Sequence, residues 1–426
     1  MKMKIQPNKS FHLLLLRSTL ISPAINKPMK EVFVIDALRT PVGKYGGALS
    51  SVRPDDLAAL VIKKIIERNP NIDLKRIEEV IFGDANQAGE SNRDVARMAL
   101  LLAGLPVEIA GVTVNRLCAS GLQSVMDATR AIKCGEGEIY IAGGVESMTR
   151  APFVMAKSDS AFSRKTEIYD TTIGWRFTNK LLADKYYPYS MGETAENVAE
   201  KWKINRDEQD RFAHSSQSKY LVAHEAGKFA DELIAVNIYN AKGEVQSFEK
   251  DEHPRLTSIE KLAQLKPSFK KDGTVTAGNS SGINDGAACL ILASESVVKE
   301  MNLTPIARVV SSAAAGVDPA YMGIGPVPAI QKALHRAGLK VNDIDLIELN
   351  EAFASQSIAC IRDLKLDESK INVNGGAIAI GHPLGCSGSR ISATLIHEMK
   401  RRKAKYGLAT MCVGVGQGAA IIYERV

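Results

Sequence analysis

Hydrophobic and polar positions along this chain follow two alternating patterns, and together they predict strands separated by helices. Short apolar runs bounded by turn residues indicate strands, whereas apolar positions that recur every three or four residues indicate helices. In the first third of the chain the predicted strands cover residues 31–37, 77–82 and 138–142, and the predicted helices cover residues 55–68 and 92–103. This alternation is typical of an α/β fold with a mostly parallel sheet that is covered on both faces.

The residues around Cys118 move from a short apolar run, through small residues, into a helical pattern. Residues 112–117 suit a short buried strand, residues 119–121 permit a sharp turn, and apolar positions recur at helical spacing over residues 122–132. Cys118 is thus predicted at a helix N-terminus, where unpaired N–H groups and the helix dipole favour the nucleophilic thiolate. A lone cysteine is also commonly a small buried core residue, so the choice between these two roles depends on the rest of the chain.

The same order of elements returns near the carboxyl end of the chain. The predicted elements of this second copy lie at residues 307–311, 327–337, 344–354, 371–399 and 407–418. The unit at 371–399 repeats the strand, turn and helix around Cys118, and the unit at 407–418 is a strand that runs into glycines, as residues 138–148 do. Two copies of one α/β unit predict a pseudo-twofold fold in which the loops after the strands meet at a shared site.

Between the two copies the composition changes. Residues 149–278 are charged and rich in Tyr, Lys, Asp and Glu, with helical patterns at residues 193–203 and 207–226. We expect this inserted region to act as a lid or to mediate oligomerisation.

Length and charge narrow the class of protein. The chain has 426 residues, which suggests two to three domains, and a formal net charge of +6. Residues 1–28 hold five basic and no acidic residues, so the remainder is nearly neutral and a basic surface for nucleic acid is not expected. The apolar run in this segment is cut short by Arg17 and is too brief to span a membrane. We expect residues 1–28 to be a dispensable extension or an upstream start, with a mitochondrial-type presequence as the alternative.

The six cysteines are scattered along the chain and form no CxxC pair. They are Cys118, Cys134, Cys289, Cys360, Cys386 and Cys412. This spacing suggests neither a zinc site nor a secreted disulfide framework, and it favours a reducing compartment.

Three further motifs at predicted strand ends carry groups suited to acyl transfer. Asn350 in NEAFA places an amide after a strand, although an asparagine there is commonly a turn cap. His382 in GGAIAIGHPLGCSG lies among glycines at a strand-to-helix turn, where it could activate a nucleophile. Cys412 in CVGVGQG ends a strand, and its alternative role is a core cysteine beside a glycine turn. With Cys118, these residues predict a covalent nucleophile, a base, a proton donor to carbon and N–H donors for an oxyanion.

These motifs closely resemble those of the thiolases, the acetyl-CoA C-acyltransferases. VNRLCASG, NEAFA, GGAIAIGHPLGCSG and CVGVGQG carry the resemblance, with TAGNSSGINDGAA and MGIGPVPA between them, and it extends from Met29 to Val426. It implies a five-layered αβαβα fold built from two duplicated halves, with an inserted loop domain that also binds CoA. The implied units are an extension at 1–28, an N-terminal half at 29–148 and 279–300, a loop domain at 149–278, and a C-terminal half at 301–426.

The resemblance also implies roles for individual residues. Cys118 would carry the acyl group, His382 would activate it, and Cys412 would move the proton at the α-carbon of acetyl-CoA. Asn350, through a water, and His382 would form one oxyanion hole, and the backbone N–H groups of Cys118 and Gly414 would form the other. The implied positions for the CoA arm and acyl pocket are Ser281, Ala277 and Met322. The implied reaction is ping-pong cleavage of a 3-oxoacyl-CoA, with CoA as a substrate and no metal or redox cofactor.

Several stretches resemble the degradative branch of the family, in particular the β-ketoadipyl-CoA thiolases of aromatic catabolism. They are TTIGWRF, KDEHPR and DGTVTAGNSSGINDGAA. In ESMTRAPF, Phe153 stands where short-chain biosynthetic members carry a histidine, which argues against a short-chain preference. A dicarboxylic acyl chain would need a cationic partner, and we expect Arg150 or Arg176 to supply it. The resemblance further implies a cytoplasmic homodimer or homotetramer that binds acyl-CoA and CoA, with no nucleic acid or membrane partner.

Two other functions share part of this pattern. A decarboxylating ketoacyl synthase would be expected to use two histidines or a His/Asn pair beside its cysteine, whereas the second proton-transfer position here is Cys412. A non-catalytic acyl-CoA or lipid carrier of similar shape would not need Cys118, Asn350, His382 and Cys412 together. The sequence therefore predicts a thiolase.

Overall fold

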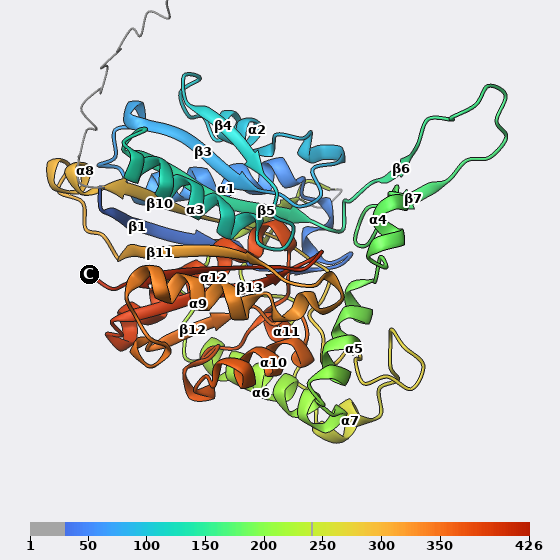
Figure 1. The fold of residues 1–426 in the computed structure, drawn as a ribbon. Helices are drawn as coiled ribbons and strands as arrows, with labels where there is room; N and C mark the ends of the chain where they lie inside the picture. The colour runs from blue at the N-terminus through green and yellow to red at the C-terminus, as the bar shows by residue number, and fades with distance from the viewer. Residues whose placement is uncertain (1–29, 240–241) are drawn as a thin grey trace, which may run out of the picture.

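Ten strands form one mixed sheet that runs through the whole molecule (Figure 1). The computed structural model describes residues 30–239 and 242–426, so the predicted extension at 1–28 lies outside the described residues. The strand order is β12-β13-β14-β11-β1-β10-β5-β3-β4, with β2 paired to β10. The strands are β1 (Val32–Arg39), β2 (Gly43–Lys44), β3 (Ile77–Gly83), β4 (Ala110–Val114), β5 (Ile139–Ser147), β10 (Asn284–Ser294), β11 (Ala307–Gly316), β12 (Leu346–Leu349), β13 (Tyr406–Val413) and β14 (Gln417–Glu424).

Helices divide this sheet into layers. The helices of the two halves are α1 (Pro54–Arg68), α2 (Val95–Leu102), α3 (Ser120–Cys134), α8 (Glu295–Glu300), α9 (Pro326–Ala337), α10 (Ala354–Leu364), α11 (Ala377–Ile380) and α12 (Leu384–Arg402). Helices α3 and α12 pack against each other between the half of the sheet that ends at β4 and the half that ends at β12. Helices α1 and α2 cover the outer face of the first half, and α9 and α10 cover the outer face of the second. The result is the predicted five layers, and the largest apolar cluster joins α3 and α12 to both halves of the sheet.

The sheet is not mostly parallel, and this expectation from the sequence is wrong. Only the pairs β3-β4, β3-β5 and β12-β13 are parallel, and the remaining pairs of the sheet are antiparallel. One reason is that β13 and β14 are joined by the turn Gly414 to Gly416, in which Val415 has a φ of 62° and Gly416 a φ of 77°. Strands joined by so short a turn must run in opposite directions.

The strand before Cys118 also differs from its prediction as a buried strand. Strand β4 lies at the end of the sheet and pairs only with β3, so several of its side chains reach solvent. Its expected counterpart in the second copy is reduced to a single bridge between Ile347 and Ile371, followed by the short helix α11. The two copies therefore resemble each other more closely in their helices and strand ends than in their edge strands.

Glycines bring the two halves close together beside the site. The strand predicted at 138–142 does not end at Gly143, because β5 continues through Gly143 and Gly144 to Ser147. A Cβ on Gly144 would lie 2.0 Å from the carbonyl oxygen of Gly385, and one on Gly121 would lie 2.6 Å from the same oxygen. The missing side chains thus let the start of α12 approach both β5 and the start of α3.

The inserted region supplies the outer part of the molecule. It contains α4 (Lys180–Lys185), α5 (Met191–Lys201), α6 (Arg206–Glu225), α7 (Ile259–Ala263) and the hairpins β6 (Phe153–Met155) with β7 (Ile168–Asp170) and β8 (Val236–Tyr239) with β9 (Val245–Phe248). Helices α5 and α6 confirm the two helical patterns that the sequence predicted there. The β6–β7 hairpin extends away from the body of the molecule (Figure 1).

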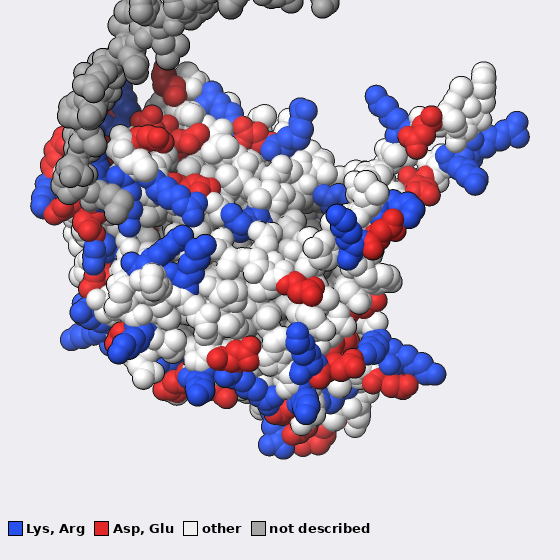
Figure 2. Space-filling model, viewed as in Figure 1, with Lys and Arg blue, Asp and Glu red and all other residues white. Residues whose placement is uncertain are grey.

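The surface carries charges of both signs. On the face in Figure 2, Lys and Arg are interspersed with Asp and Glu, with uncharged surface between them. Of the helices in the described part of the chain, none has the length and apolar character needed to cross a membrane.

Candidate active site

A cavity of about 210 Å³ lies beside Cys118 and collects residues from several strand ends. Its lining includes Cys118 and Leu117 before α3, Glu146 in β5, and Gly414 after β13. The inserted region closes it with residues 171–176 and 189–191. The duplicated halves and the insertion therefore meet at one site, as the sequence predicted.

Cys118 directly precedes α3 and is held there by a tight turn. The turn places Leu117 at a φ of 46°, and the Ser120 hydroxyl donates to the carbonyl of Leu117 at 2.6 Å. Its Sγ accepts the backbone N–H groups of Cys118 and Gly414. Burial nevertheless raises the pKa of the Cys118 thiol to about 11, against the lowering effect of these two N–H groups, and Glu146 adds to the rise.

The expectation that the helix N-terminus holds Cys118 as a thiolate is therefore wrong for the protein without substrate. Desolvation disfavours the charged form more strongly than two N–H donors stabilise it. The cysteine rests as a thiol, and a base must remove its proton before it can attack.

His382 is a buried residue whose backbone and ring are each held by a hydrogen bond. Its backbone N–H donates to Asn284 Oδ1 at 2.9 Å, and its Nδ1 lies 2.6 Å from Ser387 Oγ. The Ser387 hydroxyl donates its own hydrogen to the carbonyl of Pro383 at 2.8 Å, so it must accept from Nδ1–H. The neutral ring therefore carries its proton on Nδ1, and Nε2 keeps a free lone pair.

The surroundings of His382 keep its imidazole uncharged. Burial lowers its pKa to about 3, and the positive charge of Arg390 contributes to the lowering. The imidazole is thus neutral across the physiological range. Gly381 before it has a φ of 111°, and a Cβ there would lie 2.6 Å from the Asn284 side chain, so this position requires glycine.

Asn350 is buried next to His382. Its Nδ2 lies 3.4 Å from His382 Nε2, which is a long contact, and its Oδ1 has no hydrogen-bond partner in the described residues. A buried amide without a full set of partners is uncommon, so these groups are available to a ligand or to solvent.

Cys412 lies at the end of β13 in a small apolar cluster. It packs with Met322, Phe353 and Val275, among others, and is almost completely buried. Burial raises the pKa of its thiol well above the ordinary value, and the nearby Cys118 contributes. The structure thus brings the two cysteines of the predicted pair together, both as thiols.

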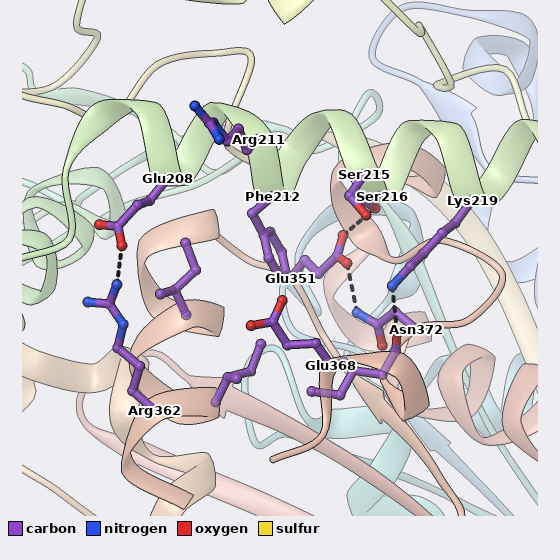
Figure 3. Close-up of a pocket in the computed structure, with 13 residues that line it drawn as sticks. Glu208, Arg211, Phe212, Ser215, Ser216, Lys219, Glu351, Arg362, Glu368 and Asn372 are labelled. Atoms are coloured by element: carbon purple, nitrogen blue, oxygen red, sulfur yellow. Dashed lines mark hydrogen bonds and ion pairs between the residues drawn. The ribbon is translucent and has the colours of Figure 1, made fainter. Parts of the chain in front are cut away.

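A network behind Asn350 holds the loop that carries His382. Figure 3 shows Glu351 reaching Ser216 of α6 and Asn372, with distances of 2.7 Å for both hydrogen bonds. The backbone N–H of Ile378 also donates to the Glu351 carboxylate at 3.1 Å. The adjoining pocket, of about 300 Å³, shares no lining residue with the Cys118 cavity.

Of the predicted site residues, Cys118 and Gly414 line the cavity, whereas His382, Asn350, Cys412, Ser281, Ala277 and Met322 are not in its lining. Ser281 donates through Oγ to the carbonyl of Ala352 at 3.1 Å, and Arg255 donates to the carbonyl of Ala277 at 2.7 Å. Met322 reaches the site only through the Cys412 cluster. Among residues 30–239 and 242–426, no three His, Cys, Asp or Glu side chains are grouped so that they could hold a metal ion.

The two arginines considered as carboxylate partners differ in their surroundings. Arg150 donates from Nε and Nη2 to the carboxylate of Glu90 at 2.5 and 2.6 Å. Arg176 lines the Cys118 cavity and, within the described part of the chain, donates only to the side chain and carbonyl of Asn86.

Three residues at the site were missed in the sequence. Ser387 and Asn284 fix His382, and Glu146 binds the N–H groups of Ala85 and Gly385 at 3.0 and 2.7 Å. Ser387 could have been found as a hydroxyl five positions after His382 on the first turn of a predicted helix. Asn284 and Glu146 give no local signal, because their partners are distant in the sequence.

Comparisons with known proteins agree with this geometry. The family model described as "Thiolase, N-terminal domain" matches residues 32–296, and the model described as "Thiolase, C-terminal domain" matches residues 303–425. A 3-oxoadipyl-CoA/3-oxo-5,6-dehydrosuberyl-CoA thiolase of Escherichia coli is 56% identical over 401 residues, which covers 93% of this chain and 100% of that protein. A β-ketoadipyl-CoA thiolase of Pseudomonas aeruginosa is 56% identical over 400 residues with the same coverage.

Solved structures give the same result for the fold. An acetyl-CoA acetyltransferase of Bacillus anthracis superposes with a TM-score of 0.88 at 42% identity, over 94% of this chain and 100% of that chain. Human mitochondrial 3-ketoacyl-CoA thiolase in complex with CoA superposes with a TM-score of 0.87 at 44% identity, over 94% and 99%. The chain therefore belongs to the thiolase family of acyltransferases.

Proposed function

We propose that this enzyme cleaves 3-oxoadipyl-CoA with CoA to give acetyl-CoA and succinyl-CoA, through an acyl group carried on Cys118. The observation that carries the proposal is the Cys118 site itself, in a chain 56% identical to relatives named for this substrate. In that site the Cys118 thiol meets two backbone N–H donors, and the neutral imidazole of His382 lies beside Asn350.

In the first half of the reaction, His382 Nε2 takes the proton of Cys118. The resulting thiolate attacks the C3 keto carbon, and the C2–C3 bond breaks with its electron pair on C2. Cys412 then gives its proton to C2, which releases acetyl-CoA. In the second half, Cys412 takes the proton of the CoA thiol, CoA attacks the thioester, and His382 returns a proton to Cys118.

Two sets of donors stabilise the negative oxygens that form in these steps. The N–H groups of Cys118 and Gly414 already point at the Cys118 sulfur, so they suit the thioester oxygen bonded beside it. Asn350, through a water, and protonated His382 suit the enolate oxygen of acetyl-CoA. Ser281, Ala277 and Met322 belong to the proposed CoA and acyl-binding surface.

The test is a comparison of kcat/KM for 3-oxoadipyl-CoA, acetoacetyl-CoA and a medium-chain 3-oxoacyl-CoA in the thiolysis direction. We expect the highest value for 3-oxoadipyl-CoA. A preference for either other substrate would overturn the substrate assignment, and cleavage of none would leave only the carrier function.

We also propose that the enzyme assembles as a homodimer or homotetramer, partly through the region 149–278. The unpaired edge of β4 and the exposed apolar side chains Phe153, Met155 and Ile168 on the β6–β7 hairpin support this, because such surfaces are commonly covered in assemblies. Light scattering coupled to size-exclusion chromatography would give the mass, and a monomer at micromolar concentration would contradict the proposal. A cytoplasmic location is part of the same proposal, supported by six free cysteines.

A further inference from the structure

Arg176 stands out among the residues that line the Cys118 cavity. It lies in the segment 171–176 of the inserted region, between β7 and α4. The segment is held in place at both ends. Asn86 Nδ2 donates to Thr171 Oγ1 at 3.1 Å, and Trp175 Nε1 donates to the carbonyl of Tyr189 at 3.0 Å. The arginine therefore enters the cavity from a fixed wall.

The cavity has two residues of charged type in its lining, Arg176 and Glu146. Glu146 is occupied by the backbone N–H groups of Ala85, Asn86 and Gly385, at 3.0, 3.2 and 2.7 Å. Burial and the neighbouring Asp84 raise the pKa of its carboxyl well above the ordinary value. Glu146 thus has its own backbone partners and forms no ion pair with Arg176.

Several N–H groups of the Arg176 guanidinium have no acceptor in the described part of the chain. Its Nη2 donates to Asn86 Oδ1 at 3.1 Å and to the Asn86 carbonyl at 3.4 Å. The side chain forms no ion pair with any of the described residues, and its Nε and Nη1 have no acceptor among them. Arg150 differs, because its Nε and Nη2 donate to the Glu90 carboxylate and its Nη1 donates to the carbonyl of Ser50.

We propose that Arg176 binds the distal carboxylate of the acyl group carried on Cys118, and so selects dicarboxylic over neutral 3-oxoacyl-CoA substrates. The inference rests on the proposed function. The acyl group left on Cys118 after cleavage of 3-oxoadipyl-CoA is succinyl, whose free carboxylate is a short chain away from the thioester, and Cys118 and Arg176 line the same cavity. A guanidinium with unused N–H groups can bind this carboxylate through charge-assisted hydrogen bonds.

The experiment uses Arg176→Gln, Arg176→Lys and the control Arg150→Gln, with two matched substrates. One is 3-oxoadipyl-CoA and the other is 3-oxohexanoyl-CoA, which has the same number of acyl carbons but no distal carboxylate. We expect Arg176→Gln to lower kcat/KM for 3-oxoadipyl-CoA by at least about 10-fold and to leave 3-oxohexanoyl-CoA nearly unchanged. Arg176→Lys keeps the charge without the fork and is expected to fall between Arg176→Gln and the native enzyme. Arg150→Gln is expected to keep the native preference.

A second readout isolates the acyl half of the reaction. Mass spectrometry follows the acylation of Cys118 by succinyl-CoA and by butyryl-CoA, and only the succinyl rate should depend on Arg176. Equal losses on both acyl groups, or a native preference retained in Arg176→Gln, would overturn the role of Arg176 and leave the proposed function intact. A native enzyme without preference for 3-oxoadipyl-CoA would instead overturn the proposed function, and the inference with it.

Discussion

Replacing Ser387 by alanine tests how the protein keeps His382 ready to act as a base. The Ser387 hydroxyl is the acceptor for His382 Nδ1–H at 2.6 Å, and it is itself fixed by the carbonyl of Pro383. The variant leaves the buried Nδ1–H without an acceptor. The ring can then recover a partner by moving its proton to Nε2, which removes the Nε2 lone pair beside Asn350.

The expected size of the effect follows from the cost of an unsatisfied buried donor. That cost is about 1–3 kcal/mol, which corresponds to a loss of about 5- to 150-fold in the rate of Cys118 acylation. Binding of CoA should change little, because Ser387 lines neither the Cys118 cavity nor any predicted CoA position.

The assay is quenched-flow acylation of the enzyme by acetyl-CoA, with the adduct quantified by intact-protein mass spectrometry. Ser392→Ala is the matched control, since Ser392 is a buried serine on the same helix whose hydroxyl donates to Gly388 and accepts from Tyr423. We expect this control to lose some stability but to acylate at the native rate. Native acylation by a folded Ser387→Ala variant would refute the reasoning on the tautomer.

Three further predictions concern proton transfer, pH and packing. Cys412→Ala should still acylate Cys118 from an activated acyl donor but should fail to exchange the α-protons of acetyl-CoA with deuterium, and normal exchange would remove Cys412 from its role. His253 has a pKa lowered to about 4 by burial, so it is neutral in the folded protein and takes up a proton on unfolding at mildly acidic pH. The contribution of His253 to the free energy of unfolding is present above pH 6.5 and is lost as the pH falls toward 4. His253→Gln should therefore lose about 1–2 kcal/mol less than the native protein between pH 6.5 and 5 in urea titrations, and equal losses would contradict the assignment. Gly144→Ala places a Cβ against the carbonyl oxygen of Gly385 and should lower stability by about 1–3 kcal/mol or more, whereas an unchanged melting temperature would show that the two halves can separate without cost.

The sequence predicted the helices and the site motifs well, because both leave local signals. Apolar spacing placed α1 and α9 almost to the residue, and the structure brings His382 beside Asn350 and Cys412 beside Cys118. Strand direction could not be predicted in the same way. It depends on which strands become neighbours, and the pairing of β10 with β1 and β5 joins segments far apart in the chain.

The pKa values and hydrogen-bond partners of single side chains also could not be predicted from the sequence. Burial of the Cys118 thiol raises its pKa, and Glu146 contributes. Its position at a helix N-terminus had predicted a lowered pKa. The acceptor for the His382 backbone is Asn284, 98 positions earlier in the chain. Arg150 and Arg176 looked equivalent in the sequence, and they are separated by the position of Glu90 and by the Cys118 cavity, which Arg176 lines.

The central claim is that Cys118 carries the acyl group of a dicarboxylic substrate. The most direct measurement is mass spectrometry of the enzyme quenched during turnover of 3-oxoadipyl-CoA at limiting CoA, followed by peptide mapping. We expect one succinyl adduct per chain, located on the peptide that contains Cys118 and absent from Cys118→Ala. No adduct, or an adduct that persists in Cys118→Ala, would contradict the central claim.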